Sequence, residues 1–393
     1  MRISVGIDAA KEEHWATAVT AEGRVVLNRM VTTNTGEDIR AFISELAALG
    51  DERIIGIDML GGIATLITAM LVAAGEHVVH VPGLAVNRAR QGTTGGQAKS
   101  DPKDARVIAD QLRLRDDFRT IALGDDDSAE LRLLVGRRDD LVVDQTRRFT
   151  RLRYLLTSIH PSLERVLDVT QPGPLTLLGH LVTAAEIRAA GRPGILAVLK
   201  NTKIRQPDRL AKLAAEAAAK HPEITLPGEA ATAELVREFA AEAMACRARI
   251  LRLEKRLETL VSRHPDGALI RSLPGMGAVL TAKLLAQAGD FRRFRSAAAL
   301  AAAAGLAPVL RQSGKSRHLR RPSYANNNLK NTLFRAAFCS LGQTESRAFY
   351  DRKRAEGKRH SQALIALARR RVDVLWAIVH SRTPYNPQHR LTA

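Results

Sequence analysis

Apolar and polar residues alternate at the start of the chain, as they do in β-strands with one buried face. The alternation runs from Ile3 to Ile7 and leads directly into Asp8. Residues 14–20 and 24–32 have a similar pattern and are joined by a short turn that contains a glycine. Three successive strands with short links predict an antiparallel meander, with an acidic side chain held rigidly at the end of its first strand.

Helical and strand-like patterns then take turns. Apolar residues at helical spacing over 36–49 predict a helix, and the apolar run 54–57 predicts a buried strand that ends at Asp58. A second helix is expected over 62–74 and a further strand over 78–81. With a closing helix, the order is βββαβαβα, which is that of the ribonuclease-H-like topology. The sequence therefore predicts an α/β domain in the N-terminal third.

Two carboxylates stand three residues apart where that closing helix should begin. Pro102 suits the first helical position, so Asp101 and Asp104 should share one helix face. One interpretation is structural: Asp101 would be the N-cap, and Asp104 would favour the positive end of the helix dipole. The other is a shared divalent cation, which prefers hard oxygen ligands. This segment alone does not choose between them.

The predicted topology brings further acids to the same place. The first strand should lie beside the strand that follows the first helix, with the closing helix across their ends. Four carboxylates would then converge: Asp8, Asp58, Asp101 and Asp104. Like charges so close together are costly unless a cation neutralises them. We therefore expect a catalytic metal site for Mg²⁺, with Mn²⁺ as the alternative ion.

A basic, glycine-containing connection precedes these acids. Residues 83–99 include Arg88, Arg90 and Lys99, and their glycines match neither a phosphate-binding loop nor a dinucleotide fingerprint. The connection is either a mobile surface loop or a flexible basic flap over the metal site. In the second case Lys99 is expected to contact nucleic-acid phosphate.

Long amphipathic patterns dominate the middle of the chain. Residues 128–160 and 230–264 each predict a long helix with a narrow apolar seam and charged remaining faces, which is typical of coiled coils. The two helices would pair with each other or with a second subunit, and we expect a homo-oligomer, a dimer or a tetramer. The predicted division is 1–127, an α/β domain; 128–265, long helices; and 266–393, a mainly helical C-terminal domain.

A glycine turn opens the C-terminal domain. The segment 273–277 precedes a predicted helix and resembles a helix-hairpin-helix turn, in which the backbone N–H groups of Gly275 and Gly277 would bind phosphate. A tight turn between two helices also needs glycine for purely structural reasons.

A serine stands among cations further along. Ser313 has a glycine beside it in what the sequence predicts to be a loop. The surrounding cations are expected to contact nucleic acid and are Arg311, Lys315, Arg317, Arg320 and Arg321. Such a setting could activate a hydroxyl nucleophile and stabilise charge on a phosphate under attack. The alternative is a serine that only contacts phosphate or shapes a turn.

The charge balance indicates a polyanionic partner. The formal net charge is +19, and from Leu306 onward 18 Lys and Arg stand against 4 Asp and Glu. Such an excess favours nucleic acid, with an acidic membrane surface second. Two cysteines far apart in the chain form no disulfide framework or zinc motif. With a first strand in place of a signal peptide and no bilayer-length apolar stretch, we expect a cytoplasmic protein without membrane association.

Taken together, these motifs resemble a known family over nearly the whole chain. The motifs are Gly6-Ile7-Asp8, Gly56-Ile57-Asp58, the segments 99–105 and 273–277, Gly305-Leu306-Ala307-Pro308 and Gln312-Ser313-Gly314. The chain resembles the DEDD transposases of bacterial insertion sequences (insertion sequence family 110), which act as bridge-RNA-guided recombinases. The resemblance implies a RuvC-like, ribonuclease-H-fold domain joined through a coiled coil to a C-terminal transposase domain.

The resemblance also implies roles for residues and partners. Asp8, Asp58, Asp101 and Asp104 would bind the metal, and Ser313 would link covalently to DNA phosphate. Acids and serine would come from different protomers, and a structured guide RNA would pair with donor and target DNA. The second acid is usually Glu in this family and here is Asp58, which is one methylene shorter but an equally hard ligand.

The expected function is therefore a Mg²⁺-dependent DNA transposase or site-specific recombinase. Three alternatives remain. A metal-dependent nuclease of the Holliday-junction-resolvase kind would use the acids without the serine. An actin-like ATPase domain could begin at Gly6-Ile7-Asp8, although no later phosphate loop supports it. A basic nucleic-acid-binding module would have no chemistry at all.

Overall fold

The structure of the chain is a computed structural model. It describes residues 2–31, 33–50, 52–59, 61–93, 99–121, 126–200, 204, 206–314, 316–320, 322 and 325–387. The chain divides into two compact units, Met1–Asp125 and Asp126–Ala393. The predicted three-domain division stays a prediction.

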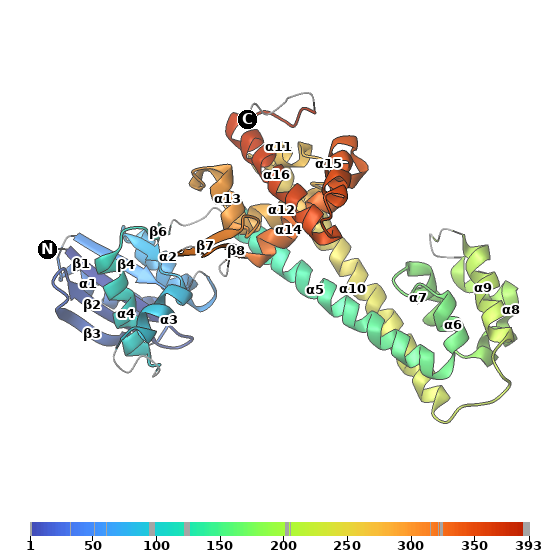
Figure 1. The fold of residues 1–393 in the computed structure, drawn as a ribbon. Coiled ribbons are helices and arrows are strands. Elements are labelled where there is room, and N and C mark those ends of the chain that lie inside the picture. Colours follow the sequence, from blue (N-terminus) through green and yellow to red (C-terminus); the bar gives the residue numbers. More distant parts are fainter. Residues whose placement is uncertain are drawn as a thin grey trace. The chain divides into compact units, whose positions relative to one another are not determined.

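A six-stranded mixed sheet forms the centre of the first unit, with the strand order β3-β2-β1-β4-β5-β6 (Figure 1). The strands are β1 (Arg2–Ala9), β2 (His14–Thr20), β3 (Val25–Val31), β4 (Glu52–Ile57), β5 (Val78–His80) and β6 (Arg119–Thr120). The first three strands form an antiparallel meander, and β1, β4 and β5 run parallel. The predicted meander and the predicted pairing of the first strand with the strand after the first helix are confirmed.

Helices cover both faces of this sheet. They are α1 (Gly36–Ala47), the 3-10 turn η1 (Gly62–Ala64), α2 (Thr65–Ala73), α3 (Gly83–Gln91) and α4 (Asp101–Leu114). Alternating residues Ile3, Val5 and Ile7 pack in one core with α1 and α2. The opposite face packs against α3 and α4 in a second, smaller core.

The prediction of a loop over residues 83–99 is wrong for its first part, because residues 83–91 form α3. Pro82 precedes the helix, and Val86 is its only buried residue. One apolar contact leaves no periodic stripe in the sequence, so the pattern that usually predicts a helix is missing. The helix forms because it packs against α4.

The contact of α4 with the sheet depends on two glycines that face each other in β1 and β4. Gly6 pairs with Gly56 in the parallel register. A Cβ on Gly6 would lie 2.1 Å from the carbonyl oxygen of Ala105 and 2.4 Å from the amide nitrogen of Ala109. A Cβ on Gly56 would lie 2.8 Å from a methyl of Leu112. The backbone of α4 can therefore rest directly on the two strands that lead to Asp8 and Asp58.

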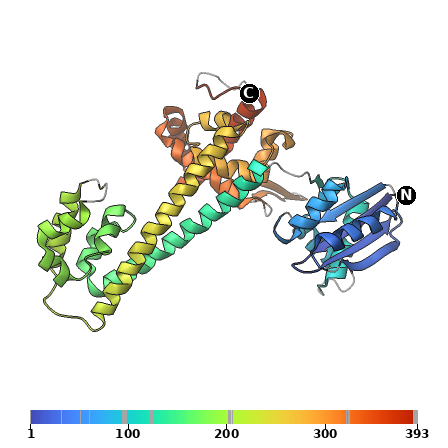
Figure 2. The same ribbon diagram turned by 180° about the vertical axis from the view of Figure 1, so that it is seen from behind.

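Two long helices, α5 (Asp126–Ile159) and α10 (Glu229–Arg263), lie side by side in the second unit (Figures 1 and 2). The small helices between them in the sequence are α6 (Pro161–Val166), α7 (Pro172–Leu178), α8 (Ala184–Leu199) and α9 (Pro207–Ala219). These four pack with one end of the long pair in their own core. The two predicted long helices are thus present, and they pack against each other within one chain.

The C-terminal part of this unit is mainly helical and packs with the other end of the long pair. Its elements are α11 (Gly267–Ser272), α12 (Ala278–Ala288), η2 (Phe291–Arg293), α13 (Ala297–Ala303), β7 (Val309–Ser313), β8 (Ser316–Arg320), α14 (Asn327–Cys339), η3 (Ser340–Gly342), α15 (Thr344–Ala355) and α16 (His360–Ser381). None of the helices in the described part of the chain is long and apolar enough to cross a membrane.

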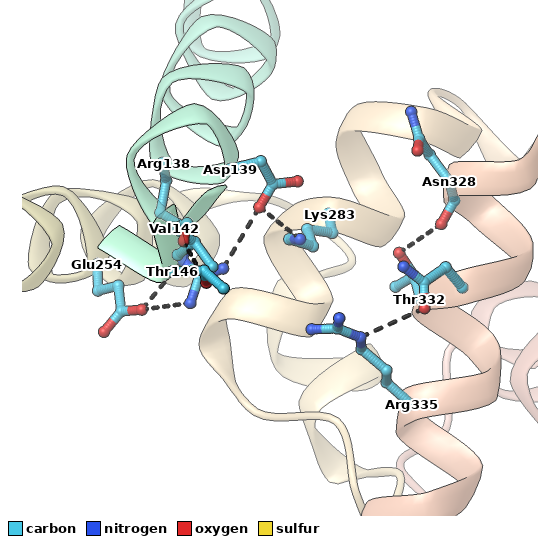
Figure 3. A network of polar contacts seen from close by, with 10 residues as sticks. Arg138, Asp139, Val142, Thr146, Glu254, Lys283, Asn328, Thr332 and Arg335 are labelled. Atoms are coloured by element: carbon cyan, nitrogen blue, oxygen red, sulfur yellow. Dashed lines mark hydrogen bonds and ion pairs between the residues drawn. The ribbon is translucent and has the colours of Figure 1, made fainter. Parts of the chain in front are cut away.

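Polar side chains join the long pair to α12. Arg138 of α5 donates to Glu254 of α10 at 2.7 Å, and Lys283 of α12 forms an ion pair with Asp139 (Figure 3). On the neighbouring helix α14, Thr332 donates to the carbonyl oxygen of Asn328 at 2.8 Å. The two ion pairs link α5 to α10 and to α12 where the C-terminal helices meet the long pair.

We expect Gly6→Ala to destabilise the first unit, because the new methyl group would meet backbone atoms of α4 that cannot turn aside. The expected loss is about 3 kcal/mol of the free energy of unfolding. In a Trp376→Phe background, the fluorescence of Trp15 in β2 reports urea unfolding of this unit. Gly36→Ala is the control: its Cβ would come no closer than 3.7 Å to another group, so its stability should change by less than about 0.5 kcal/mol. Equal losses in the two variants would contradict the proposed contact.

Candidate functional site

Asp8 and Asp58 stand at the same edge of the sheet. Ile7 of β1 pairs with Ile57 of β4, so the two aspartates follow in register, Asp8 within β1 and Asp58 directly after β4. Side chains two residues apart in a strand point to the same face. Asp8 therefore shares the face of Gly6, which is the face covered by α4.

The two acids of α4 lie in its first turn. The helix begins at Asp101, and Ser100 is its N-cap, so the interpretation of Asp101 as the cap is wrong by one residue. The helix thus starts one residue earlier than the sequence pattern predicts, and Pro102 is its second residue. Asp101 is exposed, whereas Asp104 is buried, with 5% of its surface accessible. Both carboxylates remain favourable at the positive end of the helix dipole.

Burial and the charges of neighbouring acids act on Asp8 and Asp58. Burial, followed by the charges of Asp58, Asp101 and Asp104, raises the pKa of Asp8 to about 7. Burial also raises the pKa of Asp58, with Asp104 adding to the effect. Lys99 is exposed and lowers the pKa of both Asp8 and Asp58. The site thus holds more negative charge than its surroundings compensate.

An arginine from α3 already binds one of the acids. Nη1 of Arg90 donates to both carboxylate oxygens of Asp104, at 2.8 Å each. Nη2 of Arg90 donates to the side-chain oxygen of Asn87 at 2.8 Å, which fixes the guanidinium group. The side chains of Arg90 and Asp104 are only 13% and 7% exposed. The guanidinium group therefore acts as an internal counter-ion for Asp104.

The carboxylate oxygens of this site have the chemistry of ligands for a divalent cation. Oδ1 of Asp58 is buried and has no hydrogen-bond partner among the described residues, which leaves a carboxylate oxygen in need of a positive charge. Carboxylate oxygens are the ligands that Mg²⁺ and Mn²⁺ prefer. Among the described residues, however, no group of three or more acidic, histidine or cysteine side chains is arranged so that it could hold a metal ion. Arg90 on Asp104 accounts physically for one missing ligand.

Ser313 lies in the second unit, at the end of a strand rather than in a loop. β7 and β8 form an antiparallel hairpin in which Ser313 pairs with Ser316 across the tip, and Gly314 has φ +54°. Ser313 is exposed. The strands were not predicted because Val309 and Leu310 are 47% and 43% exposed, so no buried face marks the hairpin in the sequence. Ser313 is therefore accessible at the end of β7.

The cations predicted around Ser313 divide between the two faces of this hairpin. His318 and Arg320 share the face of Ser313 in the register, whereas Arg317 pairs with Gln312 on the opposite face. Lys315 and Arg321 lie outside the described residues, and only the backbone of Arg311 is described. His318 is thus a candidate neighbour of the serine that the charge pattern did not reveal.

The glycine turn lies between α11 and α12, as predicted. Gly275 has φ +82°, and a Cβ there would lie 2.4 Å from the carbonyl oxygen of Ala336 in α14. This close packing gives Gly275 a structural role. Gly277 is the N-cap of α12, and a Cβ there would meet no described atom within 4 Å. Both line an open groove of about 690 Å³.

That groove also contains acidic side chains. Glu254 and Glu258 of α10 line it, and each is held in an ion pair, with Arg138 and Arg271 respectively. Phosphate would therefore meet carboxylates as well as backbone N–H groups there. Phosphate contact by Gly275 and Gly277 stays a prediction.

Sequence reasoning missed the role of Arg90 and Asn87. Both lie in α3, and the charge of Arg90 contributed only to a general basic segment. The contact with Asp104 depends on how α3 packs against α4, which no local pattern shows. A helical reading of residues 83–91 would have placed Asn87 and Arg90 on one face, since they are three residues apart.

Comparison with known proteins identifies related chains. A family model described as "Transposase" and labelled for IS110 elements matches residues 5–161, and the model "Transposase IS116/IS110/IS902 family" matches residues 267–351. An uncharacterized 44.8 kDa protein of insertion element IS116 from Streptomyces clavuligerus is 39% identical over 394 residues, covering 100% of this chain and 98% of the relative. An uncharacterized 42 kDa protein of insertion element IS900 from Mycobacterium paratuberculosis is 38% identical, covering 97% of this chain and 96% of the relative.

More distant similarities cover parts of the chain. A pilin gene-inverting protein from Moraxella bovis is 30% identical over 145 residues, covering 35% of this chain and 45% of the relative. The solved structure "T. thermophilus RuvC in complex with Holliday junction substrate" is 16% identical with a TM-score of 0.25, covering 31% of this chain and 100% of that one. A likeness at that score carries no argument about this chain.

Removing the charge of Asp8 should stabilise the first unit at high pH. The folded pKa of about 7 lies above the ordinary value of 3.8, so the ionised form destabilises the folded state above pH 7. This penalty fades as the pH falls from 7 toward 4, because the folded state then holds a proton that the unfolded state has lost. In EDTA, Asp8→Asn should raise the Tm at pH 8, and the gain should shrink toward pH 4.

The opposite-sign control is Asp117→Asn. Arg115 holds the pKa of that exposed carboxyl below its ordinary value, so its removal should not raise the Tm at pH 8. Thermal melts followed by Trp15 fluorescence would measure both variants. An Asp8→Asn protein without a gain at pH 8 would mean that neither burial nor the neighbouring acids disfavour the charge of Asp8.

Proposed function

The chain belongs to the IS116/IS110/IS902 family of transposases, and we propose that it cuts and rejoins DNA at the ends of an insertion element and at its target. Asp8, Asp58, Asp101 and Asp104 are the proposed metal ligands, and Ser313 is the proposed nucleophile. The proposed metal is Mg²⁺, with Mn²⁺ as the alternative.

The observation that supports this proposal most directly is the unfavourable setting of the Asp8 charge, which is disfavoured by burial and by the three neighbouring acids. A carboxyl whose pKa is raised to about 7 by burial and three further carboxylates is costly in a purely structural role. Such shifts are typical of functional sites. The strand order around β1 and β4, with α4 across them, supports a RuvC-like, ribonuclease-H-fold assignment for the first unit.

A divalent cation held by the four aspartates would polarise a phosphate oxygen and offset the negative charge of the phosphodiester. The residues of the chain would position the metal ligands and attract the substrate. The glycine contact with α4 holds Asp101 and Asp104 over the strand ends that carry Asp8 and Asp58. Lys99, beside these acids, would attract the phosphate backbone.

Ser313 would perform the covalent step. Its Oγ would lose its proton and form a bond to the phosphorus atom. The bond from phosphorus to the leaving sugar oxygen would break, and that oxygen would take up a proton and leave as a sugar hydroxyl. The phosphoserine ester keeps the energy of the phosphodiester, so attack by a new sugar hydroxyl would rejoin the strand without ATP. Arg320, on the same face of the hairpin, would offset the charge on the phosphate.

Partners and organisation complete the proposal. DNA binding is in keeping with the basic C-terminal part of the chain. We propose a structured guide RNA, and a homo-oligomer whose protomers each supply part of the active site, on the resemblance to bridge-RNA-guided members of the family. The proposed domains are a catalytic domain over 1–127, a coiled-coil region over 128–265 and a transposase domain over 266–393.

A second function has one observation in its favour. The four acids belong to the first compact unit, whereas Ser313 belongs to the second. A metal-dependent nuclease of the Holliday-junction-resolvase kind would need only the first set. Ser313 would then be a bystander.

A trapped protein–DNA adduct would test the proposed chemistry. Purified protein would be incubated with Mg²⁺, labelled donor and target DNA, and RNA transcribed from the flanks of its element, and then analysed on a denaturing gel. We expect an adduct that disappears in Ser313→Ala and in Asp104→Ala. Ser316→Ala, which changes the serine paired across the hairpin, should keep it. DNA cleavage by Ser313→Ala without any adduct would establish the metal-dependent nuclease instead.

Arg90 should compete with the metal for Asp104. Arg90→Gln removes the charge that binds both oxygens of Asp104, so we expect it to tighten Mn²⁺ binding at least about tenfold, the usual effect of a charge-assisted hydrogen bond. Isothermal calorimetry of the full chain measures this without any nucleic acid. Arg113→Gln, which removes an arginine bound to Asp110 in the same unit, is the control and should leave the affinity unchanged. An unaltered Mn²⁺ affinity in Arg90→Gln would show that Arg90 does not compete with the metal ion for the carboxylate of Asp104.

A further inference from the structure

A buried arginine in α16 lacks a carboxylate partner. Arg371 is 8% exposed, and its guanidinium group donates to the carbonyl oxygen of Pro274 and to Oγ of Ser346, at 3.4 Å for the latter. Its Nε is buried without a hydrogen-bond partner, and no ion pair within the described chain includes Arg371. By contrast, Arg369 two residues earlier is paired with Asp373. A buried charge without an opposite charge is destabilising, which indicates a missing anion.

Arg371 lines a cavity of about 760 Å³ in the C-terminal part of the second unit. The volume lies within the range of small-molecule and cofactor sites. Arg370 lines the same cavity, and the apolar lining is provided by Leu273, Phe349, Leu367, Val374 and Ile378. One compartment thus combines cationic groups with an apolar surface, which suits a ligand that has both an anionic and a flat apolar part.

The segment that follows α16 also lines this cavity and is held in place by hydrogen bonds. The segment after α16 passes over the cavity, and the backbone N–H of Tyr385 donates to Oγ of Ser272 at 2.8 Å. The hydroxyl of Tyr385 donates to Oε2 of Glu345 at 3.0 Å. Glu345 is the acidic residue in the lining, and this bond occupies one of its oxygens. The cavity is therefore largely formed before a ligand enters.

The approach to the cavity is strongly basic. The last turn of α15 carries Arg352, Lys353 and Arg354. Three cations surround the ring of Phe349: Arg352 at 5.1 Å, Lys353 at 5.6 Å and Arg370 at 5.1 Å from its centre. A free nucleotide would need only the cavity itself. Further cations that adjoin the lining residue Phe349 without lining the cavity themselves suit additional phosphates of a strand.

We propose that this cavity binds one unstacked nucleotide of a single-stranded nucleic acid, with its phosphate on Arg371 and Arg370 and its base against the apolar lining. The proposal rests on the nucleic-acid binding that belongs to the proposed function, and on none of its metal or serine chemistry. Binding at this site would fix a strand in the C-terminal part of the chain, at residues that take no part in cleavage.

A purely structural role for Arg371 makes the opposite prediction about stability. If its bond to Pro274 serves mainly to hold the glycine turn, Arg371→Met should lower the Tm. If the charge is kept for a ligand, Arg371→Met should leave the Tm of the ligand-free protein unchanged or raise it by about 2–4 °C, because an uncompensated buried charge is removed. Thermal melting therefore separates the two roles before any ligand is added.

Binding would be measured by fluorescence anisotropy with labelled single-stranded oligothymidylate and oligouridylate of about twelve nucleotides, with full-length protein in EDTA. We expect Arg371→Met to weaken binding of at least one strand about 10- to 100-fold, the usual effect of losing a charge-assisted hydrogen bond. Arg369→Met removes the same charge from the neighbouring, ion-paired position and should change the affinity less than about threefold. EDTA removes divalent cations, so the metal site does not contribute to binding in this assay. A negative result would therefore count against the proposed nucleotide site and not against the cleavage chemistry.

Further arms decide the identity of the ligand. The fluorescence of a 2-aminopurine within the strand should change when the strand binds to the wild type, and should not change when it binds to Phe349→Leu. The Phe349→Leu variant also keeps the proposal testable if Arg371→Met does not fold. Thymidine monophosphate should compete only at far higher concentration than the strand. Equal strand affinity in Arg371→Met and Arg369→Met, no response from 2-aminopurine, or free nucleotide binding as tightly as the strand would each overturn the proposal.

Discussion

The direct contact between the backbone of α4 and the strands β1 and β4 is the constraint on which the first unit depends. Gly6 and Gly56 face each other in the parallel register, and a side chain on Gly6 would overlap backbone atoms of α4. Because the strands cannot be separated from the helix by a layer of side chains, the first turn of α4 is held close to the strand ends. The proximity of the four aspartates is thus set by packing, against their own repulsion.

That repulsion has a visible consequence in the structure. Folding brings together charges whose separation would be favourable, and the chain compensates in part with its own cation, Arg90 on Asp104. The compensation is incomplete, since the pKa of Asp8 still rises to about 7 and Oδ1 of Asp58 lacks a partner within the described residues. Sites that bind a ligand strongly often lower the stability of the folded protein while the ligand is absent.

Much of the first unit could be predicted from the sequence, because its strands alternate and its apolar runs have distinct lengths. The pairing of β1 with β4 followed from the order of elements, and with it the proximity of Asp8 and Asp58. The sequence did not reveal α3, where Val86 is the only buried residue, or the hairpin that carries Ser313, whose apolar residues are exposed. The bond from Arg90 to Asp104 was equally hidden, because it depends on the packing of two helices.

Two buried charge imbalances in the described part of the chain have opposite signs, and this narrows the class of ligand. In the first unit an excess of carboxylates is balanced only in part by Arg90, and in the second Arg371 is buried without a carboxylate among the described residues. A divalent cation would satisfy the first and a phosphate the second, because each supplies the charge that the fold leaves out. A nucleic acid with its bound cations provides both.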